Sequence, residues 1–395
     1  MNRLRVLTIG HSYCVAMNRA LVREVARDPE LEITVAAPSY FHGDLRPIAL
    51  EPEPPGSPLR VVPLNTRLSR YIHIFRYDGS ALKALIQEGQ FDVVHAWEEP
   101  YVFAGYQIAR ALHDSPARFC FRTAQSYVKN YPPPFSYFER AVLARAQGWI
   151  AGASLVYQAM LKRGFPEGTG RILNLAVDLA EFRPISPSAR AQVLEELGLQ
   201  SPVIGFVGRL TRAKGLDVLM QAMEKVGARP WSLLLLGSGE YQQKLHEWAA
   251  HHGWSNRVKV LLVKHGDMPR YVASMDLLAA PSQTMKNWRE QFGRMIIEAF
   301  ACGVPVIGSD SGEIPFVIGD AGRVVGEADV AGWAQSIEQL LGSPQMRGEL
   351  MARSLARAPQ YSVATIARQY RDYYRWLAEQ SPRMAAHAVP QAAIQ

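Results

Sequence analysis

Short apolar runs alternate with longer segments of helical periodicity, and this alternation constrains the fold more than any other feature of the chain. In the first half the apolar runs lie at residues 6–9, 33–37, 93–96, 118–121 and 149–151. Runs of this length between helix-forming segments are typical of buried parallel strands joined by crossover helices. The pattern predicts a doubly wound α/β sheet.

The alternation restarts in the second half, where the apolar runs lie at residues 203–207, 233–236, 258–262, 277–280 and 304–307. A chain of 395 residues is also too long for one core of ordinary size. We therefore expect a second doubly wound, Rossmann-like domain. Open parallel sheets bind ligands outside the carboxyl ends of their strands, so the two domains should face each other across a cleft that holds the active site.

The stretch around Pro184 contains prolines, which are typical of an exposed linker between two domains. We place the first domain at residues 1–184 and the second at 185–360. Residues 361–380 are expected to form a C-terminal helix that packs back on the first domain. Residues 381–395 are rich in Ala, Pro and Gln, and we expect this tail to fray.

The net charge of +7 favours acidic partners, such as phosphorylated small molecules or an anionic membrane surface. Cys14, Cys120 and Cys302 lie far apart, which indicates neither a disulfide framework nor a metal site. The apolar run at residues 6–9 is too short for a signal peptide, and no run is long enough to span a membrane. We expect a cytoplasmic protein that could associate peripherally with the inner face of the membrane.

A glycine turn with two cations follows the predicted strand at residues 203–207. It contains Gly208 and Arg209, and Lys214 precedes a segment of helical periodicity. Glycine lets a ligand approach the backbone, while a guanidinium and an ammonium group suit phosphate oxygens. Either cation alone could be an ordinary surface charge. Their joint placement after a strand predicts a diphosphate site.

A second glycine turn, with Gly237 and Ser238, follows the next predicted strand and should reach the same edge of the sheet. A dinucleotide fingerprint would need a further glycine where the chain has Gln242, so the sequence argues against a nicotinamide cofactor. The turn either contacts the ligand or is an ordinary tight turn, and both interpretations stay open.

Two glutamates, Glu290 and Glu298, stand on either side of Phe292 and Gly293, and a helix should begin near Gly293. Free amides at its start, up to that of Arg294, would form an anion site beside Glu290. A carboxylate accepts two hydroxyl hydrogen bonds, so Glu298 suits a ribose diol and Glu290 suits sugar hydroxyls. The alternative is an acid that stabilises the helix dipole and an exposed helix glutamate.

Residues 290–298, together with the continuation Glu-Ala-Phe-Ala-Cys-Gly-Val-Pro-Val-Ile, resemble the signature of the retaining glycosyltransferases of family 4, which have the GT-B fold. The other motifs that match are Gly208-Arg209-Leu210, Lys214-Gly215, Pro281-Ser282 and the run at residues 174–184. The resemblance is in order across residues 174–320 and is thinner in the N-terminal half.

This resemblance implies roles for the motif residues. Arg209 and Lys214 would bind the donor diphosphate, Glu298 the ribose hydroxyls and Glu290 the transferred sugar. The backbone at residues 292–293 would lie near the sugar and the phosphates. Such enzymes use a nucleoside diphosphate sugar, for example a UDP-sugar or GDP-sugar, usually without a metal ion, and the chain has no Asp-x-Asp motif. No cofactor is expected beyond this donor.

The N-terminal half departs from the family at the expected acceptor side. Many relatives carry a histidine near the reacting sugar where this chain has Gln125, which can hydrogen-bond a hydroxyl but cannot act as a base. Relatives often have paired glycines where this chain has Gly10 and His11. These three residues are candidates for the acceptor side of the site.

His95, Glu98 and Glu99 are further acceptor-side candidates, because they lie at the end of the predicted strand at residues 93–96. Their side chains could orient or activate an acceptor hydroxyl. A hydrogen-bonded histidine at the strand end and two solvated glutamates are the alternative interpretation.

Two N-terminal segments, residues 59–77 and 120–138, contain no acidic residue and carry both cations and aromatic rings. These side chains include Arg60, Arg67, Arg70, Arg76, Arg122, Lys129, Tyr71, Phe75, Tyr127, Tyr131 and Phe135. Such segments suit an anionic bilayer or a phosphorylated acceptor, although ordinary solvated loops are the alternative. No nucleic-acid motif is present, so no nucleic-acid partner is expected.

The sequence therefore predicts a retaining, metal-independent glycosyltransferase. It would move a hexose or similar sugar to a hydroxyl of a glycan, lipid-linked or small-molecule acceptor, as in polysaccharide or glycolipid biosynthesis. Two alternatives share the fold. One is a scaffold protein that binds the nucleotide sugar without turnover, and the other is a nucleotide-sugar epimerase or phosphorylase.

Overall fold

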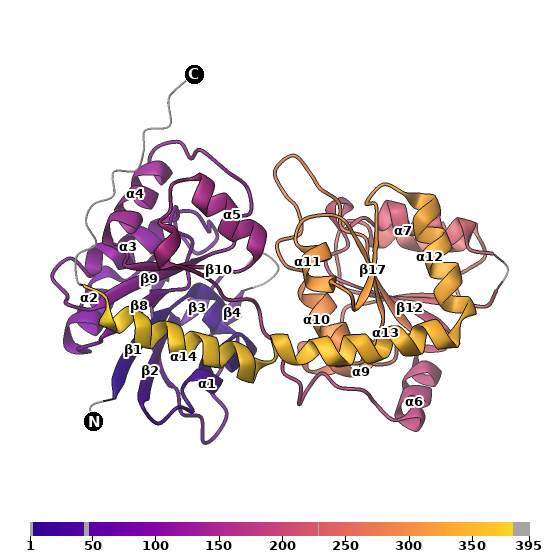
Figure 1. Cartoon of the computed structure of the whole chain (residues 1–395), viewed down its shortest axis with the longest axis horizontal. Coiled ribbons are helices and arrows are strands. Elements are labelled where there is room, and N and C mark those ends of the chain that lie inside the picture. The colour runs from indigo at the N-terminus through magenta and orange to yellow at the C-terminus, as the bar shows by residue number, and fades with distance from the viewer. Residues whose placement is uncertain (1–2, 43–46, 228, 382–395) are drawn as a thin grey trace. The chain divides into compact units, whose positions relative to one another are not determined.

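The computed structural model describes residues 3–42, 47–227 and 229–381, and the chain divides into two compact units (Figure 1). The first unit comprises Met1–Asn174 and Val363–Gln395, and the second comprises Leu175–Ser362. Each unit contains one large parallel sheet.

Residues 175–184, which we assigned to the first domain, group with the second unit. A backbone hydrogen bond of 2.9 Å from the Val177 amide to the Tyr361 carbonyl ties this segment to the end of that unit. Prolines identify an exposed stretch but do not reveal which neighbour it pairs with. The tail that we expected to fray lies, from residue 382 onward, outside the described residues.

The sheet of the first unit has seven parallel strands in the order β11-β10-β9-β8-β1-β2-β5. The strands are β1 (Leu4–Ile9), β2 (Leu31–Pro38), β5 (Arg60–Leu64), β8 (Val93–Ala96), β9 (Arg118–Thr123), β10 (Gly148–Ala151) and β11 (Gly170–Ile172). All five predicted runs are strands, whereas β5 and β11 were not predicted. Both are edge strands with exposed positions, and β5 carries a proline, so neither forms a buried apolar run.

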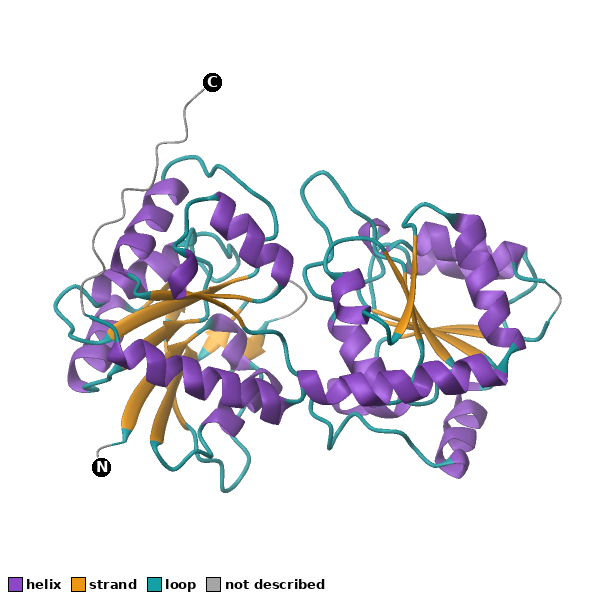
Figure 2. Ribbon diagram, in the orientation of Figure 1, coloured by secondary structure: helices purple, strands orange, loops and turns teal. Residues whose placement is uncertain are grey.

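Short antiparallel pairs and helices complete the first unit. The pairs are β3 (Tyr40–Phe41) with β4 (Ile48–Ala49), and β6 (Thr66–Arg67) with β7 (Arg76–Tyr77). The helices before the linker are α1 (Ala20–Val25), α2 (Gly79–Glu88), α3 (Phe103–Ala111), α4 (Phe135–Arg145) and α5 (Ser154–Lys162). Figure 2 shows helices around the sheet in each unit.

The C-terminal helix α14 (Val363–Glu379) groups with the first unit, where it packs on α1 and β8 (Figure 1). Its buried side chains include Ile366, Tyr370, Tyr373 and Leu377. This spacing of three and four residues places them on one face of the helix. The helix therefore covers part of the first sheet although it follows the whole second unit in the sequence.

The sheet of the second unit has six parallel strands in the order β14-β13-β12-β15-β16-β17. The strands are β12 (Val203–Val207), β13 (Ser232–Leu236), β14 (Val258–Leu261), β15 (Leu277–Ala280), β16 (Val306–Ser309) and β17 (Gly322–Val325). The helices are α6 (Pro187–Leu197), α7 (Leu216–Lys225), α8 (Gln242–His251), α9 (Met268–Val272), α10 (Arg294–Ala301), α11 (Ile314–Ile318), α12 (Val330–Gly342) and α13 (Pro344–Arg357). Among the described residues, no helix is both long and apolar enough to cross a bilayer.

In each unit the strand order reverses beside the first strand of the sheet. β12 lies between β13 and β15, and β1 lies between β2 and β8. The prediction of two doubly wound parallel sheets is confirmed. Such sheets bind ligands at the carboxyl ends of the strands around this reversal. We therefore expect a ligand site in the segments that follow these strands.

Candidate active site

Two glycine turns pack against each other where β12 and β13 end. Gly208 follows β12, Gly237 follows β13, and the Leu210 amide donates to the Ser238 carbonyl oxygen at 2.9 Å. A Cβ atom on Gly237 would lie 1.9 Å from the Gly208 carbonyl oxygen, so only glycine permits this approach. The two turns therefore share one edge of the sheet, and Gly237 is needed for their packing whether or not it touches a ligand.

Helix α7 starts directly after the loop that carries Arg209 and Lys214. Its N-cap is Gly215, whose φ of +73° lies in the left-handed region. A Cβ atom on Gly215 would lie 1.7 Å from the carbonyl oxygen of Pro281, the residue that follows β15. Gly215 thus lets the Lys214 loop pack directly against the end of the neighbouring strand.

Replacing Gly215 with alanine is expected to lower the free energy of unfolding more than the same change at Gly198. Both residues have positive φ, +73° and +62°, so both substitutions carry the left-handed penalty of about 1–2 kcal/mol. Only Gly215→Ala adds a clash, because no atom lies within 4 Å of the Cβ position at Gly198. Denaturant unfolding should show an additional loss of at least about 2 kcal/mol. Equal losses would mean that the Pro281 segment moves aside freely.

Glu290 and Lys214 form a shielded ion pair at this edge. Lys214 Nζ lies 2.5 Å from Glu290 Oε2, and the Ser282 hydroxyl donates to the same oxygen at 2.9 Å. Lys214 Nζ also lies 4.9 Å from the centre of the Trp288 ring. Glu290 is only 8 % exposed. No described residue hydrogen-bonds Glu290 Oε1, so this oxygen can accept a hydrogen bond from a ligand.

Arg209 lies in the same loop but differs from Lys214 in its surroundings. Its side chain is exposed, and among the described residues it forms no ion pair and no hydrogen bond. A guanidinium group has five N–H donors in a planar fork that matches phosphate oxygens. Arg209 can therefore turn toward an anionic ligand without breaking an existing contact.

Helix α10 begins at Arg294, with Gly293 as its N-cap, close to the predicted start. Helix geometry leaves the amides of its first turn without acceptors inside the helix, so they can bind an anion. The Phe292 ring is buried and lies edge-on to the Tyr361 ring, with centroids 5.8 Å apart. Phe292 packs inside the second unit and can offer a ligand only its backbone.

Glu298 lies one helical turn beyond Arg294 and is buried, which differs from an exposed helix glutamate. Burial raises the pKa of its carboxyl group to about 7, although the Arg294 guanidinium, with Nε 3.4 Å from Oε1, opposes this shift. A buried carboxyl group with no closer partner among the described residues suits a ligand that brings its own hydroxyl donors.

The raised pKa of Glu298 predicts a pH-dependent stability that Glu298→Gln should lack. Between the ordinary pKa of 4.5 and about 7, the folded chain binds more protons than the unfolded chain, so stability falls as the pH rises through this window. The free energy of unfolding of the variant should thus rise relative to wild type by up to about 3 kcal/mol between about pH 4 and about pH 8. Denaturant unfolding across this range measures the difference. A constant difference would contradict the prediction.

In the first unit, His11 and Glu98 meet at the ends of β1 and β8. Glu98 Oε1 accepts the His11 amide at 2.7 Å, and Oε2 lies 2.8 Å from His11 Nδ1. The Tyr77 hydroxyl donates to Glu98 at 2.8 Å. Gly10 has no room for a side chain, because a Cβ atom would lie 2.8 Å from Cβ of Trp97. The structure therefore brings three predicted acceptor-side residues together.

Glu99 and Gln125 meet through Thr123 at the end of β9. Glu99 accepts the Thr123 hydroxyl at 2.7 Å and the Ala124 amide at 2.7 Å, and the Gln125 amide donates to the Thr123 hydroxyl oxygen at 3.2 Å. Burial raises the pKa of Glu99 above its ordinary value, while these hydrogen bonds oppose the shift. Glu99 thus orders the segment that presents Gln125.

His95 is not part of this group. It is fully buried, its Nδ1 lies 2.9 Å from the Tyr374 hydroxyl, and its ring packs near those of Trp97 and Tyr370. Burial lowers its pKa to about 3, so the imidazole is neutral. The expectation that His95 contacts an acceptor does not fit this position, because α14 covers the side chain. The alternative that we considered, a packed histidine at the strand end, describes it.

Sequence reasoning assigned no role to Ser282 and Trp288, although both contact the Lys214–Glu290 pair. Ser282 could have been identified by the rule that selected Arg209, because it follows the end of a central strand. Trp288 lies in the loop after β15, where it forms a short antiparallel bridge with Met285, and its position over Lys214 depends on how this loop folds. No periodicity in the sequence reports such a contact.

The second unit thus brings cations and helix starts together at one sheet edge, where the Glu290 carboxylate contacts Lys214. Arg209, Lys214 and the helix starts of α7 and α10 can hold phosphate oxygens, while Glu290 and Glu298 can accept hydroxyl hydrogen bonds. The cations and helix amides suit phosphate groups, and the two carboxyl groups suit sugar hydroxyls. Together they fit a phosphorylated sugar better than any one kind of group alone.

The chain matches two family models, one in each half. Residues 17–181 match the model described as Glycosyltransferase Family 4, and residues 192–355 match the model described as Glycosyl transferases group 1. The matches fall in the first and second units respectively, apart from residues 175–181. The resemblance stated above for the C-terminal half therefore extends to most of the N-terminal half.

Three curated relatives illustrate the range of similarity. A GDP-mannose-dependent monoacylated alpha-(1-6)-phosphatidylinositol monomannoside mannosyltransferase from Corynebacterium glutamicum is 36 % identical over 188 residues, 46 % of this chain and 49 % of that protein. D-inositol 3-phosphate glycosyltransferases are 28 % identical over 74 % of the chain and 65 % of the protein in Salinispora tropica, and 26 % identical over 94 % and 92 % in Xylanimonas cellulosilytica. The chain spans about half the length of the first relative and less than two thirds of the second.

Solved structures share the fold. A glycosyltransferase from Rickettsia africae superposes with a TM-score of 0.78, 18 % identity and coverage of 96 % of this chain and 100 % of that chain. Anabaena Alr3699/HepE in complex with UDP gives a TM-score of 0.73, 18 % identity and coverage of 95 % and 100 %. At this level of identity the likeness describes architecture alone.

Proposed function

Because the chain belongs to the glycosyltransferases of family 4, which have the GT-B fold, we propose that it transfers a sugar from a nucleoside diphosphate sugar to an acceptor hydroxyl. The observation that carries this proposal is the shielded Lys214–Glu290 pair beside the unpaired Arg209. It combines cations for a diphosphate with a carboxylate for a sugar at one sheet edge.

Each donor-side residue has a defined task in this proposal. Arg209 and Lys214 neutralise the negative charge that develops on the departing diphosphate, and the amides at the start of α7 and α10 add to it. Glu298 accepts the ribose hydroxyls, and Glu290 Oε1 accepts a hydroxyl of the transferred sugar. The Ser282 hydroxyl and Lys214 hold Glu290 in place through Oε2.

We propose that the reaction retains the anomeric configuration. The bond between the anomeric carbon and the diphosphate oxygen breaks, and the acceptor oxygen bonds to that carbon on the same face. The departing phosphate oxygen takes the acceptor proton, so no separate base is needed. This agrees with a glutamine, Gln125, at the position where a histidine was expected.

Transfer is expected to continue at an unchanged rate in excess EDTA and to give a product with the anomeric configuration of the donor. The reason is that Arg209 and Lys214 supply the positive charge that a divalent ion supplies in other phosphate chemistry. Proton NMR of the product reports the anomeric coupling, and initial rates with and without EDTA test the metal. An inverted product, or activity lost in EDTA and restored by Mg²⁺, would contradict the proposal.

The relatives suggest the class of substrates. One is named for GDP-mannose and a phosphatidylinositol mannoside, and others are named for D-inositol 3-phosphate. We propose a GDP-sugar or UDP-sugar as donor, no further cofactor, and an acceptor that is a phosphorylated polyol or a lipid-linked sugar at the inner face of the membrane.

Thermal-shift screening of GDP, UDP and ADP identifies the donor base, because a ligand that binds the folded chain raises its apparent stability. Transfer assays with the matching nucleotide sugars then test the reaction. Tight binding without transfer or hydrolysis would favour a scaffold protein. Release of an altered sugar without acceptor would favour an epimerase.

A further inference from the structure

Two acid-free segments of the first unit, far apart in sequence, lie side by side in the structure. Residues 54–77 and 115–138 contain no Asp or Glu. The His73 ring lies 5.9 Å from the Tyr101 ring and 6.0 Å from the Phe135 ring, and Tyr101 stacks on Tyr131 at 4.1 Å. A single surface region therefore combines both segments.

The loop between β6 and β7 turns several apolar side chains outward. Leu68, Tyr71 and Ile74 are 48 %, 60 % and 40 % exposed, although they stand within seven residues. Leu68 has a φ of +59°, and this left-handed conformation is unfavourable for a bulky residue. Because the Leu68 side chain is exposed, its burial does not compensate for this cost in free energy. Phe75, in contrast, is fully buried, so our expectation of an aromatic surface there is wrong for this residue.

Buried contacts fix the base of this loop. Phe75 packs edge-on against Phe41, with centroids 5.1 Å apart, and the Tyr77 hydroxyl donates to Glu98. The exposed side chains therefore belong to a loop whose base is packed against the rest of the first unit.

The same loop carries three exposed arginines, Arg67, Arg70 and Arg76. Their side chains form no ion pair and no hydrogen bond with the described residues. Arg67 and Arg76 stand directly opposite each other across β6 and β7, and like charges in this placement repel each other. A backbone hydrogen bond lowers the pKa of Asp78, and the charge of Arg67 adds to this shift, so one carboxylate offsets part of this repulsion. A hollow of about 580 Å³ beside them is lined by both arginines and also by Asp78, Phe103 and Gln107.

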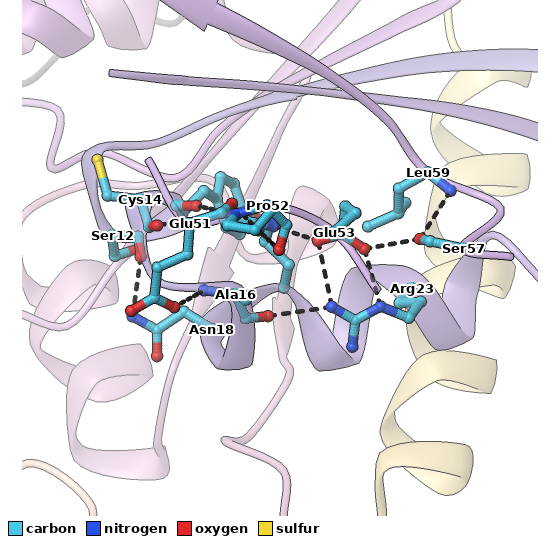
Figure 3. Close-up of polar contacts among 12 residues, drawn as sticks. Ser12, Cys14, Ala16, Asn18, Arg23, Glu51, Pro52, Glu53, Ser57 and Leu59 are labelled. Carbon is cyan, nitrogen blue, oxygen red and sulfur yellow. Dashed lines mark hydrogen bonds and ion pairs between the residues drawn. The ribbon is translucent and has the colours of Figure 1, made fainter. Parts of the chain in front are cut away.

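The acids nearest the loop in the sequence hold other groups, and of these acids Asp78 also lies beside Arg67. Glu53 binds Arg23 at 2.9 Å, and Glu51 accepts the Ala16 amide at 2.7 Å (Figure 3). Glu53 also forms an ion pair with Arg19. On the other side, Asp78 accepts the Ala81 amide at 3.0 Å as the N-cap of α2. The outward charge of residues 66–77 is therefore positive.

We propose that residues 66–77, the docking loop, bind the surface of an anionic phospholipid bilayer. The apolar side chains enter the interface between headgroups and acyl chains, and the arginines bind lipid phosphates. The inference deepens the proposed function, because it rests on an acceptor that resides at a membrane. Binding itself requires neither donor nor turnover.

Co-sedimentation of the full chain with vesicles tests the docking loop. Wild type should bind equimolar phosphatidylcholine and phosphatidylglycerol and bind pure phosphatidylcholine far more weakly. Arg67→Gln with Arg70→Gln should weaken binding about thirtyfold, which corresponds to about 1 kcal/mol for each arginine. Tyr71→Ser with Ile74→Ser should weaken it about tenfold or more, through the loss of apolar contact.

Matched variants in the second unit control for charge and exposure. Lys225→Gln with Arg353→Gln removes the same net charge, and Leu262→Ser with Phe316→Ser removes two exposed apolar side chains. Both should bind vesicles as wild type does. Equal binding to both lipid mixtures, or equal losses in loop and control variants, would overturn the proposal. Sugar-nucleotide hydrolysis by the loop variants reports the proposed function separately, since it needs no vesicle.

Discussion

Replacing Glu290 with glutamine is expected to lower kcat for sugar transfer about 100- to 1,000-fold while the protein stays folded. The amide keeps the shape of the side chain but has no charge to pair with Lys214, and it can accept hydrogen bonds through only one of its two polar atoms, so Lys214 and the sugar hydroxyl cannot both keep an acceptor oxygen of their own. Loss of one preorganised electrostatic contact at a reacting centre has an effect of this size. Initial rates at saturating donor, with circular dichroism of the variant, measure both parts of the prediction.

Glu338→Gln is the matched control, because Glu338 also accepts a hydrogen bond in the second unit, from the Gly227 amide at 2.7 Å, but lies on α12 away from the edge. This variant should retain the wild-type rate. If Glu290→Gln also retained it, Glu290 would be a structural partner of Lys214, and the assignment of the sugar site would fail.

Lys214→Met is expected to lower kcat/KM for the donor by at least about a hundredfold. The thioether side chain has a similar length but cannot neutralise a departing diphosphate, and it leaves the Glu290 carboxylate shielded without its cation. Because the shielded Glu290 carboxylate loses its cation, a modest loss of stability should accompany the kinetic effect. Arg209→Ala should impair catalysis to a similar extent without that loss, because Arg209 is exposed and has no partner among the described residues.

The double variant Glu290→Gln with Lys214→Met separates a shared role from two independent ones. If the two residues act as a unit, the double variant should lose little more than the single variants. Lys244→Met provides the control, since Lys244 forms an ion pair with Asp217 at 2.6 Å in the same unit. A loss of activity in that control equal to the loss in Lys214→Met would show that any broken lysine pair disturbs the enzyme.

The interior strands of both sheets were predictable, because a strand buried on both faces is mostly apolar. Three of the four edge strands, β5, β11 and β17, were not predicted, and β5 illustrates the reason, since Arg60 and Pro63 are tolerated only where one side of the strand faces away from the sheet. The domain boundary also shifted. A linker segment joins the unit with which it hydrogen-bonds, and that choice depends on partners distant in the sequence.

Arg209 and Lys214, which we assign to the donor, were selected from the sequence because they follow the end of a central strand. Ser282 follows the end of another central strand but was assigned no role. Burial was less predictable. From the sequence, Glu298 could be an exposed helix glutamate and His95 could contact an acceptor. In the structure both side chains are buried, and His95 is hydrogen-bonded to Tyr374 of α14. In the docking loop, exposure was equally hard to predict. Composition identified the cations of the loop but not which of its rings face outward.

The sequence by itself determined the two doubly wound sheets, the glycine turns at their edges and the residue types that can hold a sugar nucleotide. These properties depend on local periodicity and on strand ends, and short segments of the chain determine both. Only the tertiary structure decided that Lys214 pairs with Glu290, that Trp288 covers the lysine and that α14 encloses His95. Such contacts join residues tens to hundreds of positions apart, and their energies depend on distance and burial, which no single segment specifies.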